Sequence, residues 1–92
     1  MARVFIDWNL KITLKLFATL GEFLPDQAHA NEVDVEVSEG TTPHEVIDRF
    51  DVPRALVHLV LLNGVYLSAD QRSTVRLQTG DALAIWPPVA GG

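Results

Sequence analysis

The chain has 92 residues, enough for one hydrophobic core but not for two, because independent domains commonly contain about 100 residues. It is 48% hydrophobic and contains no cysteine, which excludes a disulfide framework, a thiolate metal site and a cysteine nucleophile. The net charge of −5, with seven scattered Lys and Arg residues, disfavours nucleic-acid binding, which needs clustered basic side chains.

The first element in the chain is a β-strand pattern. Even positions are apolar over residues 4–16, and the odd positions among them become regularly polar from Asp7 onward. One strand of that length would be longer than a domain of this size is wide. The pattern therefore predicts a main strand over residues 10–16, a break at 7–9, and an added edge piece or ordered arm over 4–6.

Two short elements follow the first strand. Apolar residues at helical spacing predict a short first helix that Pro25 ends: Phe17, Leu20, Phe23 and Leu24. Residues 32–37 then alternate valines with acidic residues, which predicts a half-buried strand with a polar outer face.

The main helix has the clearest start signal in the sequence. Thr42 is the expected N-cap, Pro43 takes the first helical position, and Glu45 completes a capping box. Pro53 ends the helix, because the residue before a proline is pushed out of the helical region. The core-facing stripe is predicted to be Val46, Ile47 and Phe50.

The last third of the chain predicts strands. Residues 55–62 are apolar on both faces, which is typical of a central strand covered on two sides. Asn63-Gly64 predicts a type I′ hairpin turn to a short partner strand over residues 65–67. Residues 74–80 and 81–86 predict a final hairpin that turns at Gly80. We therefore expect an α+β fold, a mixed sheet with helices on one side, in a single domain over residues 1–92.

Three segments together resemble a known family. They are "LKLFATLGEFLP" near the start, "VLLNGVYL" in the middle and "TGDALAIWPPVAGG" at the end. The chain resembles the ubiquitin-like β-grasp proteins and, within them, the MoaD/ThiS group of sulfur carriers, above all the small subunit of molybdopterin synthase. The resemblance covers the chain from Leu10 onward, and the first nine residues have no counterpart in the shortest members.

The resemblance implies a function for the C-terminus. A MoeB/ThiF-like activating enzyme would use ATP to adenylate Gly92 and would convert it to a thiocarboxylate. Gly92 would then donate sulfur to a pterin precursor in a MoaE-like synthase large subunit, for molybdenum or tungsten cofactor. The chain would be a sulfur-carrier subunit that is not an enzyme by itself and binds no cofactor.

The tail, residues 87–92, suits this task physically. Pro87 and Pro88 cannot extend a ladder of backbone hydrogen bonds, so they end the last strand and project the tail outward. Gly91 and Gly92 have no Cβ and let the backbone pass through a narrow channel. The whole flexible tail is expected to thread a partner's active site: Pro87, Pro88, Val89, Ala90, Gly91 and Gly92.

Trp86 stands at the root of the tail. If Leu83 and Ile85 fill the core, the period of two turns Trp86 outward, together with Ala82 and Ala84. An exposed aromatic side chain there would anchor a partner. The alternative interpretation is that Trp86 caps the core.

Other functions remain open at this point. A thiamine-type (ThiS) or other sulfur carrier shares most of the features, and a ubiquitin-like modifier would be conjugated to lysines through the same Gly92. A plain β-grasp interaction module would need no tail at all. His29, His44 and His58 share no metal-binding spacing, so no metal site is predicted. No apolar run approaches the roughly 20 residues that span a bilayer, and no signal peptide is visible, so we expect a cytoplasmic protein.

Overall fold

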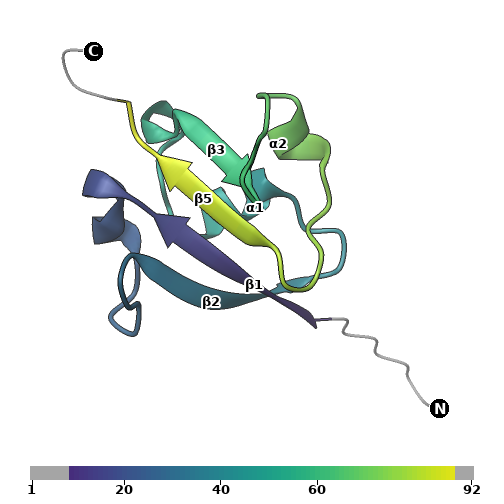
Figure 1. Cartoon of the computed structure of the whole chain (residues 1–92), viewed down its shortest axis with the longest axis horizontal. Coiled ribbons are helices and arrows are strands. Elements are labelled where there is room, and N and C mark those ends of the chain that lie inside the picture. The colour runs from purple at the N-terminus through teal and green to yellow at the C-terminus, as the bar shows by residue number, and fades with distance from the viewer. Residues whose placement is uncertain (1–8, 89–92) are drawn as a thin grey trace.

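A computed structural model describes residues 9–88 and shows a mixed five-stranded sheet in the order β2-β1-β5-β3-β4 (Figure 1). β1 and β5 run parallel, and every other neighbouring pair is antiparallel. β5 is therefore the central strand, although it is the last in sequence. The strands are β1 (Asn9–Leu16), β2 (Glu32–Ser38), β3 (Leu59–Leu62), β4 (Val65–Tyr66) and β5 (Ala82–Trp86).

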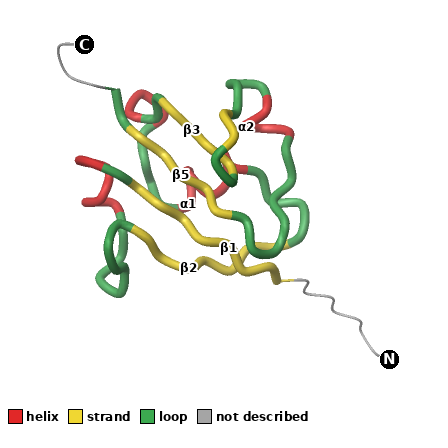
Figure 2. The backbone as a smooth tube through the Cα atoms, in the orientation of Figure 1, coloured by secondary structure: helices red, strands yellow, loops and turns green. Residues whose placement is uncertain are grey.

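Within residues 9–88, four short helical segments connect the strands. Figure 2 colours them red. They are the 3₁₀ helices η1 (Ala18–Phe23) and η2 (Arg54–Leu56) and the α-helices α1 (Pro43–Arg49) and α2 (Gln71–Thr74). α1 lies behind the sheet in the view of Figure 1. This arrangement confirms the predicted α+β fold with a main helix and a short first helix, the latter as a 3₁₀ helix.

The core lies between α1 and one face of the sheet. The even positions of β1 are fully buried from Ile12 to Leu16, and β5 contributes Leu83 and Ile85 at 0% exposure. The odd positions of β1 face the other way and are half-buried or exposed. The alternation predicted from the sequence is thus confirmed, and it leaves the second face of the sheet without a covering layer among the described residues.

The N-terminus of α1 forms as predicted. The Thr42 hydroxyl accepts from the Glu45 backbone N–H at 3.3 Å, and the Glu45 carboxylate accepts from the Thr42 N–H at 2.9 Å. Val46 and Ile47 are 1% exposed and fill the core, whereas Phe50 packs at its margin. The capping box therefore fixes the point at which the chain enters the helix that covers the sheet.

Replacing this cap should measurably destabilise the fold. We expect Thr42→Ala to lower the free energy of unfolding by about 1 kcal/mol, because the backbone N–H of Glu45 loses its acceptor, the Thr42 hydroxyl. Urea denaturation followed by circular dichroism measures the loss. Thr42→Ser keeps the hydroxyl and is expected to stay within about 0.3 kcal/mol of the parent; an equal loss for both variants would contradict the role given to the cap.

The Asn63-Gly64 turn is also confirmed. Asn63 has φ 52° and Gly64 has φ 83°, the positive values that a type I′ turn requires at both central positions. The turn joins β3 to β4, with Leu62 paired to Val65.

The prediction of a long central strand over residues 55–62 is wrong. β3 contains only Leu59–Leu62, and residues 54–56 form η2 instead. Within β3 only Val60 is buried, so the strand is covered on one face rather than two. The other apolar residues of β3 lie on the uncovered face of the sheet. A run of apolar residues in the sequence looks the same whether a strand is covered on one face or on both.

The predicted final hairpin is wrong in its first arm. Residues 71–74 form α2, and no strand forms over 74–80, so β5 pairs with β1 and β3 instead. The start of α2 has a reciprocal cap in which Ser68 N–H donates to Gln71 Oε1 at 2.8 Å and Gln71 N–H donates to Ser68 Oγ at 3.3 Å. This Ser-x-x-Gln pattern is a capping-box signal that the strand interpretation overlooked. The turn at Gly80, with φ 87°, is present as expected.

β1 includes Asn9, so the predicted break at 7–9 is wrong at Asn9, and residues 7 and 8 lie outside the described residues. The edge piece or arm expected over residues 4–6 lies outside the described residues.

Candidate functional site

The candidate site begins where the central strand ends. Trp86 is the last residue of β5, and its carbonyl accepts from the His58 N–H at 2.9 Å. Pro87, which has no N–H, is half-buried, and Pro88 is exposed. The predicted tail residues Val89, Ala90, Gly91 and Gly92 lie outside the described residues. The structure therefore defines the root of the tail at Trp86 to Pro88.

Trp86 lies on the uncovered face of the sheet, not in the core. Its neighbours Leu83 and Ile85 point to the opposite face and are fully buried, which is the first of the two arrangements considered for this strand. The indole stacks on the ring of Phe17 with centroids 4.5 Å apart and planes 14° apart. The Phe17 N–H also donates to the Ile85 carbonyl at 3.1 Å. Phe17, at the end of β1, thus holds the root of the tail through both its backbone and its ring, while Trp86 stays half-buried.

Trp86 belongs to a larger apolar area on this face. In register, Leu59 lies opposite Trp86, and Leu61 lies opposite both Ala84 and Tyr66. Leu59 and Leu61 are half-buried, and the Tyr66 side chain is 56% exposed. We name this surface the apolar face; it consists of Leu59, Leu61, Tyr66, Ala82, Ala84 and Trp86.

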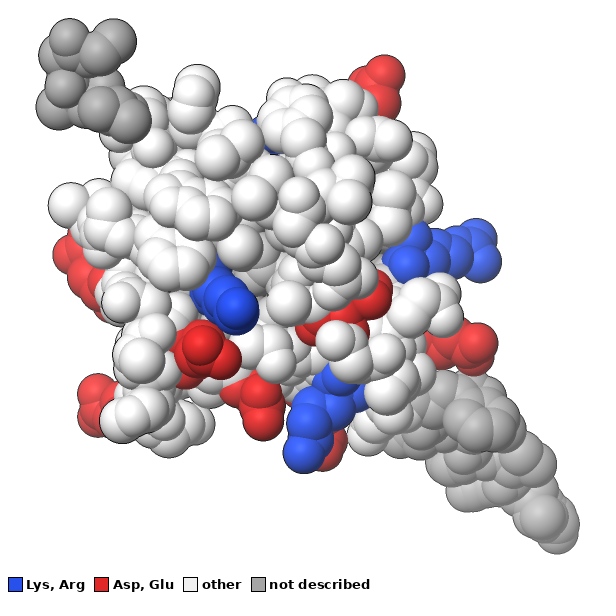
Figure 3. Space-filling view, in the orientation of Figure 1, with Lys and Arg blue, Asp and Glu red and all other residues white. Residues whose placement is uncertain are grey.

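The other half of the same face is charged. On β1 and β2, Lys15 pairs with Glu32 and Lys11 pairs with Glu36, with side chains on the outer side. Figure 3 views the molecule from this side: charged side chains gather over β1 and β2, whereas the surface over β3 and β5 is almost free of them. The uncovered face therefore has an apolar half beside the root of the tail and a charged half away from it.

A buried arginine supports the apolar face from behind. Arg72 is 9% exposed; its Nε donates to the Leu67 carbonyl at 3.1 Å and its Nη2 donates to the His58 carbonyl at 3.3 Å. Its guanidinium also lies 5.9 Å from the centre of the Tyr66 ring. Sequence reasoning missed this residue, because an arginine in the polar stretch 68–73 gives no sign that it turns inward.

The titratable groups with shifted pKa values lie on the α1 side. Partial burial lowers the pKa of His44, with a further lowering by the charge of Arg54. A hydrogen bond from Arg54 lowers the pKa of Asp48; the two side chains form a bidentate pair at 2.8 and 3.1 Å. Over residues 9–88 no cluster of histidines and carboxylates is placed to hold a metal ion. In the same span no helix is long and apolar enough to cross a membrane.

The strand order β2-β1-β5-β3-β4, with β1 and β5 parallel at the centre and one main helix across one face, is the topology of the ubiquitin-like β-grasp fold. The chain belongs to the Mut7-C ubiquitin family, whose family model matches residues 9–91. No curated protein sequence matches the chain at a significant level.

Solved structures agree with this assignment. The HVO 2177 protein of Haloferax volcanii superimposes with a TM-score of 0.75 at 22% identity, covering 99% of this chain and 94% of its own. SAMP1 from the same organism gives 0.61 at 27% identity, covering 89% and 99%. The small archaeal modifier protein 1 of Methanosarcina acetivorans gives 0.60 at 20% identity, covering 91% and 98%. The resemblance to ubiquitin-like proteins related to the MoaD/ThiS carriers is thereby confirmed, and so is the β-grasp fold.

Proposed function

We propose that this chain is a ubiquitin-like carrier that acts through the carboxylate of Gly92 and forms one domain over residues 1–92, with residues 87–92 as its tail. The observation that carries the proposal is the exit of the central strand β5, beside Phe17 and Trp86, into the sequence "PPVAGG". Family membership and the similarity to SAMP1 at 27% identity support it.

The chemistry starts with activation of a poor electrophile. A carboxylate oxygen of Gly92 attacks the α-phosphorus of ATP and releases pyrophosphate, which gives an acyl adenylate. A nucleophile then attacks the Gly92 carbonyl carbon and expels AMP. A lysine amine that loses a proton yields an isopeptide bond, whereas a hydrosulfide ion that loses its proton yields a thiocarboxylate. The activating enzyme, of the MoeB/ThiF-like kind, binds the ATP, and the chain itself is a substrate and carrier without a cofactor.

The parts of the tail have separate mechanical roles in this proposal. Pro87 and Pro88 stop the β-ladder and favour an extended backbone, so the following residues project from the domain. Val89 and Ala90 span the distance to the enzyme. Gly91 and Gly92 have no side chain and so fit beside the nucleotide.

The nature of the acceptor divides the proposal into two branches. The name of the SAMP1 structures, small archaeal modifier protein 1, favours protein modification. The sulfur-carrier branch is favoured by the segments "VLLNGVYL" and "TGDALAIWPPVAGG", with a MoaE-like large subunit and the molybdopterin or tungsten cofactor as one destination and the thiamine pathway as another.

Mass spectrometry separates these branches. The full chain is incubated with ATP, its activating enzyme, a sulfur source and a cell extract. Replacement of one oxygen by sulfur in the free chain supports the carrier, and peptides that join Gly92 to a lysine support the modifier. The whole proposal would be contradicted if the activating enzyme consumed ATP in the presence of the chain while the mass of the chain stayed the same and no peptide joined Gly92 to a lysine.

The apolar face is the expected docking surface for the activating enzyme. Trp86 is the residue of this face that lies next to the tail. We expect Trp86→Ala to weaken binding at least about tenfold, because buried aromatic anchors dominate interface energies. Trp86→Phe retains a ring that can stack on Phe17 and should lose less. Val65→Ala is the matched control, since Val65 is 65% exposed but belongs to the opposite face of β4.

Isothermal titration with the activating enzyme measures these affinities, and thermal unfolding checks that each variant folds. Unchanged affinity of a folded Trp86→Ala protein would remove Trp86 from the interface.

A further inference from the structure

A second surface, unrelated to the tail, lies along β2. Within the described part of the chain β2 is an edge strand, with β1 on one side and no strand on the other. An edge strand presents backbone N–H and C=O groups that can pair with another chain. What β2 presents depends on which of its residues turn their backbone outward.

The hydrogen bonds of β1 identify those residues. The N–H groups of Thr13 and Phe17 donate toward β5, to the carbonyls of Asp81 and Ile85, at 2.9 and 3.1 Å. Even-numbered residues of β1 therefore bond to β2, and their register partners are Val33, Val35 and Val37. By alternation, Asp34 and Glu36 turn their backbone groups to the open edge.

Both ends of this edge are closed by local contacts. Glu32 exchanges backbone hydrogen bonds with His29 at 2.9 and 3.1 Å, and the Ser38 carbonyl accepts from the Thr41 N–H at 3.1 Å. Between them, the Arg49 guanidinium donates to the Glu36 carbonyl at 2.6 Å. A side-chain donor from α1 thus occupies the position that the N–H of an added strand would take.

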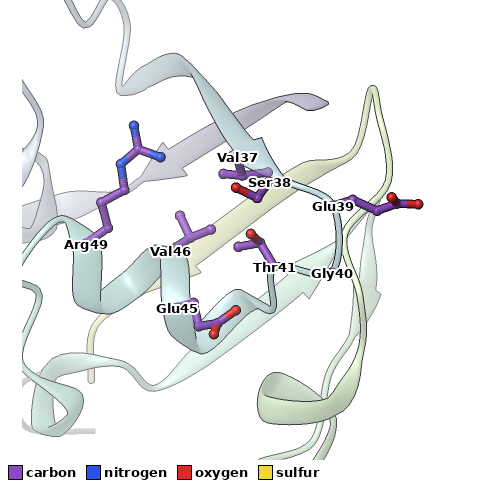
Figure 4. A pocket seen from close by; sticks show the side chains of 8 residues that line it. All are labelled: Val37, Ser38, Glu39, Gly40, Thr41, Glu45, Val46 and Arg49. Carbon is purple, nitrogen blue, oxygen red and sulfur yellow. The ribbon is translucent and has the colours of Figure 1, made fainter. Parts of the chain in front are cut away.

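A groove accompanies the edge. It has a volume of about 440 Å³ and lies between the end of β2 and α1. Figure 4 shows Val37 and Val46 between strand and helix, with Glu45 and Arg49 beside them on α1; Glu39 stands on the loop after β2 and its carboxylate points outward to solvent. The groove lies where side chains of an extended peptide laid along the end of β2 would reach.

The charge of this region selects the kind of peptide. The eight charged residues from 22 to 48 are all Asp or Glu. Lys11 and Lys15 lie opposite Glu36 and Glu32 on β1, and Arg49 lines the groove, so negative charge remains in excess here. Glu32, Asp34 and Glu36 line the outer side of β2, and Glu39 and Glu45 line the groove. Antiparallel pairing of two copies through β2 would place carboxylates opposite carboxylates, which is unfavourable. In a segment rich in Lys and Arg, every second side chain would instead lie beside a carboxylate of β2.

We propose that the open edge of β2 binds an extended basic segment of a partner protein, which adds to the sheet as a further strand. The backbone of the segment pairs with Asp34 and Glu36, and its basic side chains meet the carboxylates of β2 and of the groove. Arg49 leaves the Glu36 carbonyl when the strand arrives. This surface lies on the far edge of the sheet from β3 and β4, so the segment can bind while the apolar face is occupied.

The test uses the full ¹⁵N-labelled chain and a blocked hexapeptide that alternates arginine and valine. We expect the backbone amides of Asp34 and Glu36 to shift most on titration. Glu39→Lys is expected to weaken binding about fivefold, because one attractive pair becomes repulsive. Asp70→Lys makes the same change in net charge on α2 and should alter affinity less than about twofold.

Arg49→Ala gives the sharper result. It removes the side chain that competes for the Glu36 carbonyl and one positive charge, so the peptide should bind severalfold more tightly. Three results would each overturn the proposal. Glu39→Lys and Asp70→Lys could lower the peptide affinity equally, or Arg49→Ala could lower it. The amide shifts could also centre on Leu61 and Trp86. Self-association of the chain through β2, seen by sedimentation, would overturn it as well.

Discussion

Deletion of Gly91 and Gly92 is expected to abolish ATP–pyrophosphate exchange by the activating enzyme. The deletion leaves a carboxylate on Ala90. Under the proposed function this carboxylate is two residues short of the nucleotide, and the Cβ of Ala90 would stand where the proposed channel takes glycine. Exchange is measured with radiolabelled pyrophosphate and saturating ATP. Activity should fall by at least about a thousandfold, because without a positioned nucleophile the reaction loses its proximity advantage.

Two controls isolate the chemistry from folding. The deletion variant should unfold at the temperature of the parent chain, because the core of the described part of the chain runs from Ile12 to Ile85. It should also compete with the parent for the activating enzyme, because the apolar face is intact. Exchange at the parental rate by the deletion variant would contradict the proposed function.

Leu83→Ala should cause the largest loss of stability. Leu83 is 0% exposed in the central strand, between Leu14 on β1 and Leu62 on β3. Truncating a fully enclosed leucine removes its transfer energy and leaves a cavity, so we expect the free energy of unfolding to fall by about 3 kcal/mol. Urea denaturation of the full chain gives the value.

The same chemical change at an exposed site provides the comparison. Leu56 in η2 is 36% exposed, and Leu56→Ala should cost less than about 1 kcal/mol. A similar small loss for Leu83→Ala would show that β5 is not the centre of the core.

Features encoded by neighbouring residues could be predicted from the sequence. The capping box at Thr42 and the type I′ turn at Asn63-Gly64 each depend on a few adjacent residues, and both occur as expected. The period-two pattern of β1 likewise identified its buried face, because a strand with one covered face has to alternate.

Features that depend on distant partners could not be predicted in the same way. The sequence does not show that β5 inserts between β1 and β3, so the segment before it was assigned to a hairpin that does not form. The apolar residues 55–62 were assigned to a doubly covered strand because the run does not reveal that one side faces outward.

The candidate site shows the same division. The alternation along β5 predicted that Leu83 and Ile85 share one face and Trp86 lies on the other, but it left open whether Trp86 caps the core; the structure buries Leu83 and Ile85 and leaves Trp86 half-buried on the opposite face. The stacking of Trp86 on Phe17 and the inward turn of Arg72 were not predicted, because each joins residues far apart in the chain.

The most direct test of the central claim is tandem mass spectrometry of the C-terminal peptide after the chain has been activated in its own cell extract. The proposed function predicts that the carbonyl carbon of Gly92 carries the new bond, either to sulfur or to a lysine nitrogen. A Gly92 that keeps its free carboxylate while the chain supports cofactor synthesis or protein conjugation would contradict it.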